Sequence, residues 1–272
     1  MNPYGEPDPR LKPIPEDRAF TAASVPDAPV ATYTVSARGK SPDVPVFAFL
    51  RRQYGNLSLQ EIDSLFGFVQ RSTLYGGRMF CNAELSGRDV AQLNNAGIGV
   101  RIPMSNHYVE RHEYEKDLRI LKRYHNSINS IIITNDDLAR WIRLDFPRYK
   151  LDGSVIKNLK SHTKIEEALD IYDSVVLPMR INEDYEFLSD IKQKDRIILF
   201  ANAGCALTCP SKLCYLSISK LNKYQGGEFQ CSQPIKDRDL LGMVDFPLEP
   251  YIDMGFHHFK LLRARPNRMT GY

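Results

Sequence analysis

Four of the five cysteines in this chain of 272 residues lie in one short segment, at Cys205, Cys209, Cys214 and Cys231. Their spacing is C-x3-C-x4-C-x16-C, which matches neither the C-x2-C pairs of common zinc ribbons nor the C-x2-C-x2-C run of ferredoxins. Thiolates bind soft and borderline metals, and four of them can complete a 4Fe-4S cluster or a tetrahedral zinc site. We therefore predict that these cysteines bind one metal centre, a 4Fe-4S cluster in preference to zinc. Buried free thiols are the alternative.

The residues around the cysteines fit a ligand role. Pro210 favours an extended backbone at Cys209, which would stop a helix from carrying neighbouring thiols apart. A pair of glycines precedes Cys231 and could let the chain fold back over the site. The fifth cysteine, Cys81, lies within an expected strand, so we interpret it as a packing residue.

Polar side chains recur where the expected strands end. Parallel barrels bind substrates at the carboxyl ends of the strands, where the loops into the helices begin. Arg101, Arg180 and Lys260 supply cations there that could hold a carboxylate or a phosphate, and we predict that they converge on one pocket. The alternative for Lys260 is that it points outward, with Phe259 and Leu261 facing inward. The predicted substrate-binding residues are Arg101, Asn106, Asn135, Arg180, Asn182, Asn202 and Lys260.

The elements that would position these residues alternate along the chain from residue 78. Short apolar runs typical of buried parallel strands span 79–82, 99–102, 130–134, 149–151, 175–177 and 197–201. Segments with helical periodicity lie between them, at 87–96, 113–125, 136–143, 164–172 and 183–192. Asn135 and Asn182 stand where two of these helices could be capped, which is the alternative to substrate binding.

Six strand and helix units in a row predict an α/β fold with a parallel sheet and helices outside it. Further strands at 241–244 and 258–262 would close a (β/α)8 TIM-like barrel. The alternative is an open, doubly wound sheet. No Gly-x-Gly-x-x-Gly follows the first run, which disfavours a dinucleotide-binding sheet of that kind.

The first 45 residues hold nine of the seventeen prolines. Because proline lacks an amide donor and fixes φ, we predict an N-terminal proline-rich extended arm or linker over residues 1–45. Such an arm would be dispensable for barrel folding and could bind a partner subunit. A capping box at Ser58 and the apolar spacing after it predict a helix. Residues 46–272 would then form a single barrel domain, with the cysteine-rich metal segment at 202–231.

The composition is that of an ordinary globular protein, with 43% hydrophobic and 25% charged residues. It excludes a wholly disordered, collagen-like or fibrous chain. A formal charge of +3 is too small to indicate nucleic-acid binding by itself. The sequence shows neither a run long enough to span a bilayer nor a signal-peptide pattern, so we expect a cytoplasmic protein without a membrane span.

Three stretches of the sequence resemble the peptidase U32-like family. The stretch from Asn202 to Pro210 is similar to the family's Asn-x-Gly-Cys-x3-Cys-Pro signature. Residues 149–156 resemble its fourth strand, where a Ser-Val or Ser-Ile pair follows the strand. Residues 251–263 resemble its closing segment, in which Gly-Phe leads into Phe-Lys-x-x-Gly-Arg.

The resemblance implies a TIM-like barrel, often with cysteines that hold an iron–sulfur cluster. The family includes RNA hydroxylation factors, ubiquinone hydroxylation factors and collagenase-like peptidases. The sequence departs from its pattern at the closing Gly-Arg, replaced by Arg263-Ala264-Arg265, and at Cys214, where many relatives carry His.

From the resemblance we expect iron–sulfur-dependent modification, of the hydroxylation type, of a nucleic-acid base or a small ring compound. The partner would then be RNA or a small-molecule substrate. The alternatives are a collagenase-like peptidase and a non-catalytic barrel that a metal staples together. Neither His-Glu-x-x-His nor Gly-x-Ser-x-Gly occurs, so no sequence motif supports a peptidase.

Overall fold

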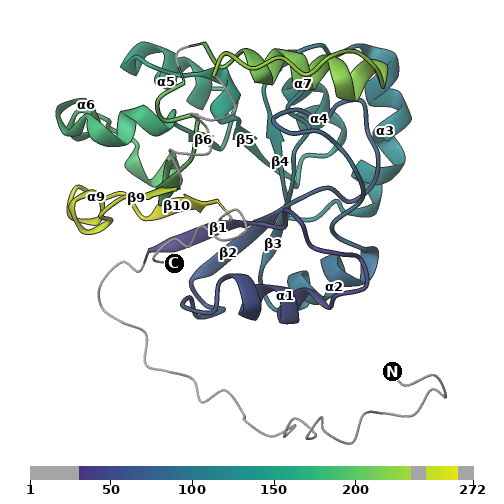
Figure 1. Ribbon diagram of the computed structural model, residues 1–272, viewed down its shortest axis with the longest axis horizontal. Coiled ribbons are helices and arrows are strands. Elements are labelled where there is room, and N and C mark those ends of the chain that lie inside the picture. Colours follow the sequence, from purple (N-terminus) through teal and green to yellow (C-terminus); the bar gives the residue numbers. More distant parts are fainter. Residues whose placement is uncertain (1–30, 210, 234–242, 263–272) are drawn as a thin grey trace, which may run out of the picture.

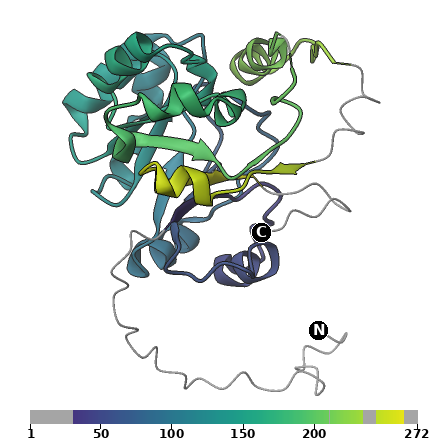
Figure 2. The ribbon, with the colours of Figure 1, turned by 90° about the vertical axis from the view of Figure 1, so that its left-hand side faces the viewer.

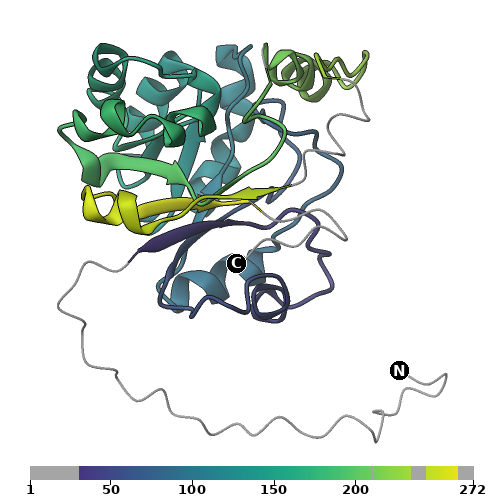
Figure 3. The same ribbon diagram turned by 60° about the vertical axis from the view of Figure 1, so that its left-hand side comes forward.

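Eight parallel strands close into a barrel in the computed structural model, which describes residues 31–209, 211–233 and 243–262 (Figure 1). The strand order around the barrel is β1, β10, β7, β6, β5, β4, β3 and β2. Figure 3 shows the closure, with β10 (yellow) between β1 (purple) and β7 (green). The predicted (β/α)8 TIM-like fold is confirmed. The strands are β1 (Thr32–Ser36), β2 (Ile62–Phe66), β3 (Gly99–Ile102), β4 (Ser130–Ile133), β5 (Lys150–Gly153), β6 (Ser174–Val176), β7 (Ile197–Phe200) and β10 (His258–Leu261).

Helices lie between the strands in sequence. They are α1 (Val46–Gln53), α2 (Gly87–Asn95), α3 (Arg111–Arg123), α4 (Asp136–Asp145), α5 (His162–Leu169), α6 (Tyr185–Ser189), α7 (Leu213–Tyr224) and α9 (Glu249–Asp253), with 3-10 turns η1 (Val155–Lys157), η2 (Met179–Glu183) and η3 (Lys194–Arg196). Side-chain caps start several of them: Ser86 forms a capping box at α2, and Ser161 caps α5. The five helices predicted between strands are all present, although α6 is shorter than expected. No helix of the described residues is long and apolar enough to cross a membrane.

Side chains along each strand alternate between the outer face of the barrel and its lumen. The outward side chains are apolar and buried, among them Val35, Val100, Ile131, Leu151, Val175 and Leu199. Part of the lumen is polar instead. Thr34 Oγ1 lies 2.9 Å from Ser64 Oγ, and the hydroxyls of Ser130 and Ser174 donate to the Asp152 carboxylate at 2.6 and 2.7 Å. These lumen groups satisfy one another, so they tolerate burial.

The arm predicted over residues 1–45 is wrong for Thr32–Ser36, which form β1 between β10 and β2. The sequence has no proline from residue 30 to residue 41, so every amide of this stretch can donate to a neighbouring strand. The barrel therefore begins before residue 46. Residues 1–30 of the expected arm lie outside the described residues.

The helix predicted from Ser58 is also wrong, because Ile62–Phe66 is strand β2. Half of the capping box does form, since the Glu61 carboxylate accepts a hydrogen bond from the Ser58 amide at 2.7 Å. This contact closes a turn instead of starting a helix. The segment pairs with β1 on one side and β3 on the other, and this tertiary pairing overrides the helical spacing of its apolar residues.

Two of the predicted strands do not belong to the barrel. Residues 79–82 form no strand, and Cys81 is exposed instead of packed. In the predicted strand 241–244, the first two residues lie outside the described residues. Val244 belongs to β9 (Val244–Asp245), which pairs antiparallel with β8 (Asn202–Ala203) in a separate two-stranded sheet. β1 and β2 take the two places in the barrel that these strands were expected to fill.

Candidate functional site

The carboxyl ends of the barrel strands surround a cavity of about 260 Å³, hereafter the mouth cavity. It lies where parallel barrels bind their substrates. Strand ends supply much of its wall, and loops supply the rest. Its lining includes Phe66, Arg78, Ser154, Cys205, Tyr215 and Lys260.

Lys260 reaches the mouth cavity from β10, and only 8% of its surface is exposed. Its Nζ lies 4.3 Å from the centre of the Phe66 ring, and within the described residues the amine has no hydrogen-bond or ion-pair partner. Burial lowers the pKa of the amine to about 8; the charges of Arg101 and Arg78 add to this effect, and Asp152 opposes it. The outward orientation considered for Lys260 is therefore wrong.

Arg101 does not line the mouth cavity. Its guanidinium lies 3.0 Å from Asp152 Oδ2 and 2.9 Å from Asp63 Oδ2, and its Nε donates to Ser64 Oγ at 2.6 Å. The pairing of β1 with β2 shifts register at Asp63, which has no partner residue on β1. A bulge of this kind changes the direction in which a side chain points. Burial acts to lower the pKa of Arg101, but Asp152 and Asp63 raise it overall. We conclude that Arg101 is part of the barrel's internal structure.

Arg180 lines a second cavity, of about 440 Å³, hereafter the cationic cavity. Lys160 and Lys212 line it as well, and its described lining contains no Asp or Glu. It shares Tyr215 and two apolar residues with the mouth cavity. Burial and the charge of Lys160 lower the pKa of Lys212, Cys209 opposes them, and Arg180 adds to the lowering. The three cations predicted to share one pocket therefore lie in three different places.

Three of the asparagines predicted to bind substrate form hydrogen bonds with backbone groups instead. Asn182 is fully buried, and its Nδ2 donates to the Phe200 carbonyl oxygen at 2.8 Å. Asn202 is also fully buried and bonds both the carbonyl oxygen and the amide of Leu262, at 2.9 and 2.8 Å. Asn135 caps α4, as the alternative interpretation expected. Their side-chain amides are thus used by the fold.

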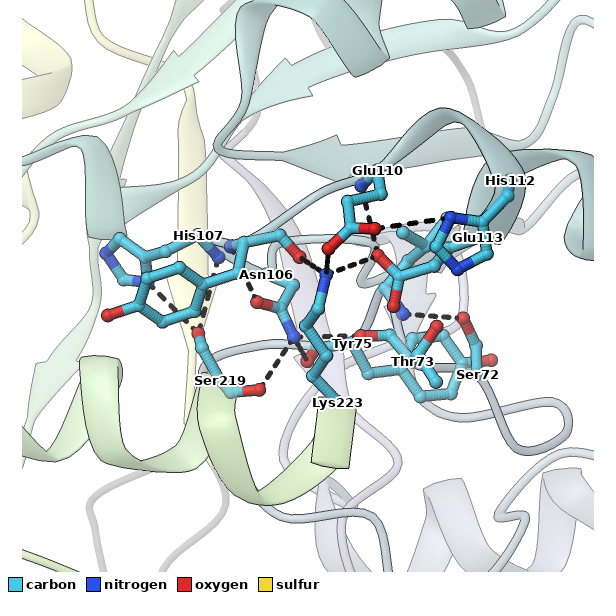
Figure 4. Close-up of polar contacts among 12 residues, drawn as sticks. Ser72, Thr73, Tyr75, Asn106, His107, Glu110, His112, Glu113, Ser219 and Lys223 are labelled. Carbon is cyan, nitrogen blue, oxygen red and sulfur yellow. Dashed lines mark hydrogen bonds and ion pairs between the residues drawn. The ribbon is translucent and has the colours of Figure 1, made fainter. Parts of the chain in front are cut away.

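The fourth, Asn106, belongs to a polar cluster that attaches α7 to the barrel (Figure 4). Its Nδ2 donates to the Ser219 carbonyl oxygen at 2.9 Å, and His107 Nδ1 lies 3.0 Å from Ser219 Oγ. Lys223 pairs with Glu113 at 2.8 Å, and both side chains are almost wholly buried. Figure 2 shows α7 (yellow-green) to one side of the group of teal and green helices in that view. This cluster therefore positions the helix whose first turn carries a predicted metal ligand.

Within the predicted metal segment, the electrostatic influence of the other three cysteines is seen at Cys214. Burial raises the pKa of Cys214 to about 11, and the charges of Cys209, Cys231 and Cys205 contribute to the rise. Cys209 Sγ accepts a hydrogen bond at 3.2 Å from the amide three residues further on. Cys231 Sγ accepts one at 3.5 Å from the amide two residues further on.

The four thiols are chemically suitable as metal ligands. The structure does not arrange them around one metal position. Four thiols near one another, with amide hydrogen bonds to sulfur, are the ligand set that iron–sulfur clusters use. Within the described part of the chain, no group of three or more His, Cys, Asp or Glu is arranged to hold a metal ion. A centre bound here would require the thiols to draw together.

No protein-family model matches the sequence, and no curated protein matches it. Among solved structures the chain is similar to one described as "The Structure of the U32 Peptidase Mk0906", with a TM-score of 0.59. The match covers 92% of this chain and 98% of the other, at 10% identity. The chain has the fold of that U32 peptidase. At this identity the likeness concerns the fold alone, because one fold hosts many chemistries.

Three residues at the mouth of this U32-like barrel lie outside the predicted site. Phe66 ends β2, a strand that the sequence did not reveal. Arg78 comes from a loop, where both of its terminal nitrogens donate to the Glu84 carboxylate. Tyr215 lines both cavities and directly follows Cys214, so its place beside a predicted ligand was a signal that could have found it.

Proposed function

We propose that the chain is a U32-like barrel enzyme that hydroxylates a nucleic-acid base or a small ring compound. An iron–sulfur cluster would be held by Cys205, Cys209, Cys214 and Cys231, with zinc as the alternative metal. The ring of the substrate would enter the mouth cavity. A cytoplasmic location is part of this proposal.

One observation carries the proposal: Cys205 lines the mouth cavity together with Lys260. A purely structural metal, which only cross-linked the last loops, would need no access to that cavity. The predicted ligand segment borders the place where barrels of this type bind substrates, so a centre bound there would face the substrate. This arrangement favours an enzyme over a metal-stapled binding protein.

The walls of the mouth cavity suit an apolar ring with a few polar substituents. Phe66 and Phe200 supply aromatic surface. Ser36, Ser154 and Lys260 supply hydroxyls and an amine that can bond to exocyclic oxygen or nitrogen atoms. Apolar walls with a few convergent polar groups are the usual composition of a small-molecule site.

Hydroxylation replaces a ring C–H by C–OH and oxidises the substrate by two electrons. With an oxygen-atom donor XO, R–H and XO give R–OH and X, so the donor loses its oxygen and is reduced. When bound, an iron–sulfur cluster supplies electron transfer between such partners. The protein's own side chains would hold the ring in place and limit the access of bulk water.

The cationic cavity would accept the anionic part of a larger substrate. Arg180, Lys160 and Lys212 present three cations without a neighbouring carboxylate in the described lining. Arg and Lys are the usual partners of phosphate groups. Because this cavity shares the Tyr215 wall with the mouth cavity, a nucleotide could place its base in one and its phosphate in the other. This favours RNA as the partner.

A peptidase is the second candidate, since the solved structure with this fold is named a U32 peptidase. His107 Nδ1 lies 3.0 Å from Ser219 Oγ, a contact that resembles a base beside a nucleophile. Ser219 has no exposed surface, however, and its carbonyl oxygen is bonded to Asn106. A peptide bond cannot reach its hydroxyl, so this pair does not support hydrolysis.

The metal half of the proposal is tested by anaerobic purification, metal and sulfide analysis and a visible spectrum. We expect a brown protein with about four irons and four sulfides per chain. Single Cys→Ser variants at the four positions should lose iron, whereas Cys81→Ser, an exposed cysteine, is the matched control and should keep it. Parent protein with neither iron nor zinc, or four variants that all keep the parent's iron, would contradict it.

The substrate half is tested by mass spectrometry of the nucleosides from total RNA. Cells without the protein should lose a nucleoside that is heavier than its parent by one oxygen atom. The wild-type chain should restore it and the Cys205→Ser variant should not. An unchanged RNA profile with an intact cluster would move the proposal to a small ring compound. Hydrolysis of gelatin peptides by iron-free protein would support the peptidase instead.

A further inference from the structure

Lys260 differs from the other buried lysines of the described residues. Lys40 pairs with Asp89 at 2.9 Å, and Lys223 pairs with Glu113 at 2.8 Å. Lys260 is buried to a similar degree and has neither a hydrogen-bond acceptor nor a carboxylate partner among the described residues. An unpaired ammonium is expensive to bury, so this position favours the neutral amine with a free lone pair.

Taken together, the charged groups around Lys260 also favour the neutral amine. Arg101 from β3 and Arg78 from the loop after β2 are cations, and Asp152 from β5 is the opposing carboxylate. That carboxylate is already held by Arg101 at 3.0 Å and by two serine hydroxyls. Together with burial, these charges lower the pKa of Lys260 to about 8. The other titratable groups of the cavity wall are Arg38, Cys205 and Tyr215.

We propose that Lys260 is a nucleophile that forms an imine with a small aldehyde or ketone in the mouth cavity. The amine nitrogen attacks the carbonyl carbon, and a C=N bond replaces the C=O bond. Both amine hydrogens leave with the carbonyl oxygen as one molecule of water, so no oxidant or reductant is consumed. Lysines that are desolvated or lie beside other cations are the type that performs this chemistry. The proposal does not depend on a metal at the cysteines.

The mouth cavity fits such a ligand in size and in polarity. Its volume of about 260 Å³ is at the small end for ligand sites, which matches a compound of a few carbon atoms. Ser36 and Ser154 line it and can donate to the carbonyl oxygen. Tyr215 lines it as well, and its hydroxyl can donate to the same oxygen. Phe66 and Phe200 exclude water that would hydrolyse the imine.

Reductive trapping on the full-length protein tests the proposal. The protein is incubated with propanal and sodium cyanoborohydride near pH 8, and peptide mapping measures the propyl group on each lysine. Hydride from the reagent converts the imine into a stable secondary amine. We expect Lys260 to be labelled about tenfold faster than Lys192, whose side chain is 82% exposed. Labelling of Lys260 at or below the rate of Lys192 would overturn the proposal.

A second variant tests whether the aldehyde arrives through the mouth cavity. Ile132 lines the cavity and is 4% exposed, so Ile132→Phe fills space there and leaves the amine intact. We expect this variant to label Lys260 several-fold more slowly and Lys192 at the parent rate, after a thermal melt has confirmed that it folds. Unchanged labelling of Lys260 in the folded variant would exclude imine formation in the mouth cavity. If this variant does not fold, the comparison of Lys260 with Lys192 in the wild-type protein still tests the proposal.

Discussion

Arg101 on β3 and Asp152 on β5 form an ion pair of 3.0 Å across the barrel lumen, with side chains 13% and 4% exposed. β4 lies between their two strands, so the pair spans a whole strand. Ser130 on that middle strand donates to the same carboxylate at 2.6 Å. Polar groups from three consecutive strands thus share one hydrogen-bond network, and the lumen is held together by charge as well as by packing.

We expect Arg101→Met to lower the free energy of unfolding by about 3 to 5 kcal/mol, because it leaves a buried carboxylate without its cation. Urea denaturation measures the change. The control is Arg140→Met, which removes a pair with Asp137 whose side chains are 63% and 67% exposed. That substitution should cost about 1 kcal/mol or less. Equal effects of the two substitutions would show that the internal pair does not stabilise the barrel.

Truncation should show that residues 1–30 of the predicted arm and the strand β1 contribute differently to folding. A chain that lacks residues 1–30 keeps every described strand, and we expect it to unfold cooperatively. A chain that lacks residues 1–36 loses β1 and leaves β2 and β10 with unpaired edges, so we expect it to lose cooperative thermal unfolding. Scanning calorimetry measures both. A sharp transition in the shorter chain would mean that the barrel tolerates the loss of β1.

Asp117 should make stability depend on pH. Burial raises its pKa to about 6, the hydrogen bond from Ser72 opposes this, and Glu113 adds to the rise. An unfolded Asp has a pKa of about 3.9, so the folded chain binds this proton more tightly than the unfolded chain. The contribution of Asp117 is therefore fully favourable below about pH 4 and is lost as the pH rises through about 6.

The matched variant for this effect is Asp117→Asn, which cannot titrate. Urea denaturation at a series of pH values gives the free energy of unfolding of wild type and variant. We expect the difference, wild type minus variant, to fall as the pH rises from about 4 to about 7. A difference that stays constant across this range would show that the pKa of Asp117 is the same in both states.

Lys223 should help to hold α7 against the barrel. Its ion pair with Glu113 is buried, so Lys223→Met leaves a carboxylate unpaired and should loosen the helix. We expect the amides of α7 to exchange with deuterium at least about tenfold faster, since 1.4 kcal/mol corresponds to that factor. Lys192→Met removes an exposed pair with Glu166 and serves as the control. Unchanged exchange in α7 would mean that packing alone holds this helix.

The strands from β3 to β7 and β10 could be found from the sequence, whereas β1 and β2 could not. The recognisable strands are mostly short runs of Val, Ile, Leu and Phe. β1 lies within the proline-rich first 45 residues, and the apolar residues of β2 follow a capping box at helical spacing. These two signals point to an arm and a helix where the fold has strands.

The sequence by itself determined the barrel class, through the repeated alternation of strand and helix, and it placed four of the five cysteines in one segment, whose joint metal binding stays a prediction. Only the tertiary structure decided which cations are available to a ligand. Arg101 and Lys260 both project into the lumen, but strand register places Asp63 and Asp152 around Arg101 and no carboxylate in contact with Lys260 among the described residues. Pairing across the barrel depends on how distant strands align, and residue types along one strand do not encode that alignment. That alignment leaves Lys260, and not Arg101, free to meet a ligand.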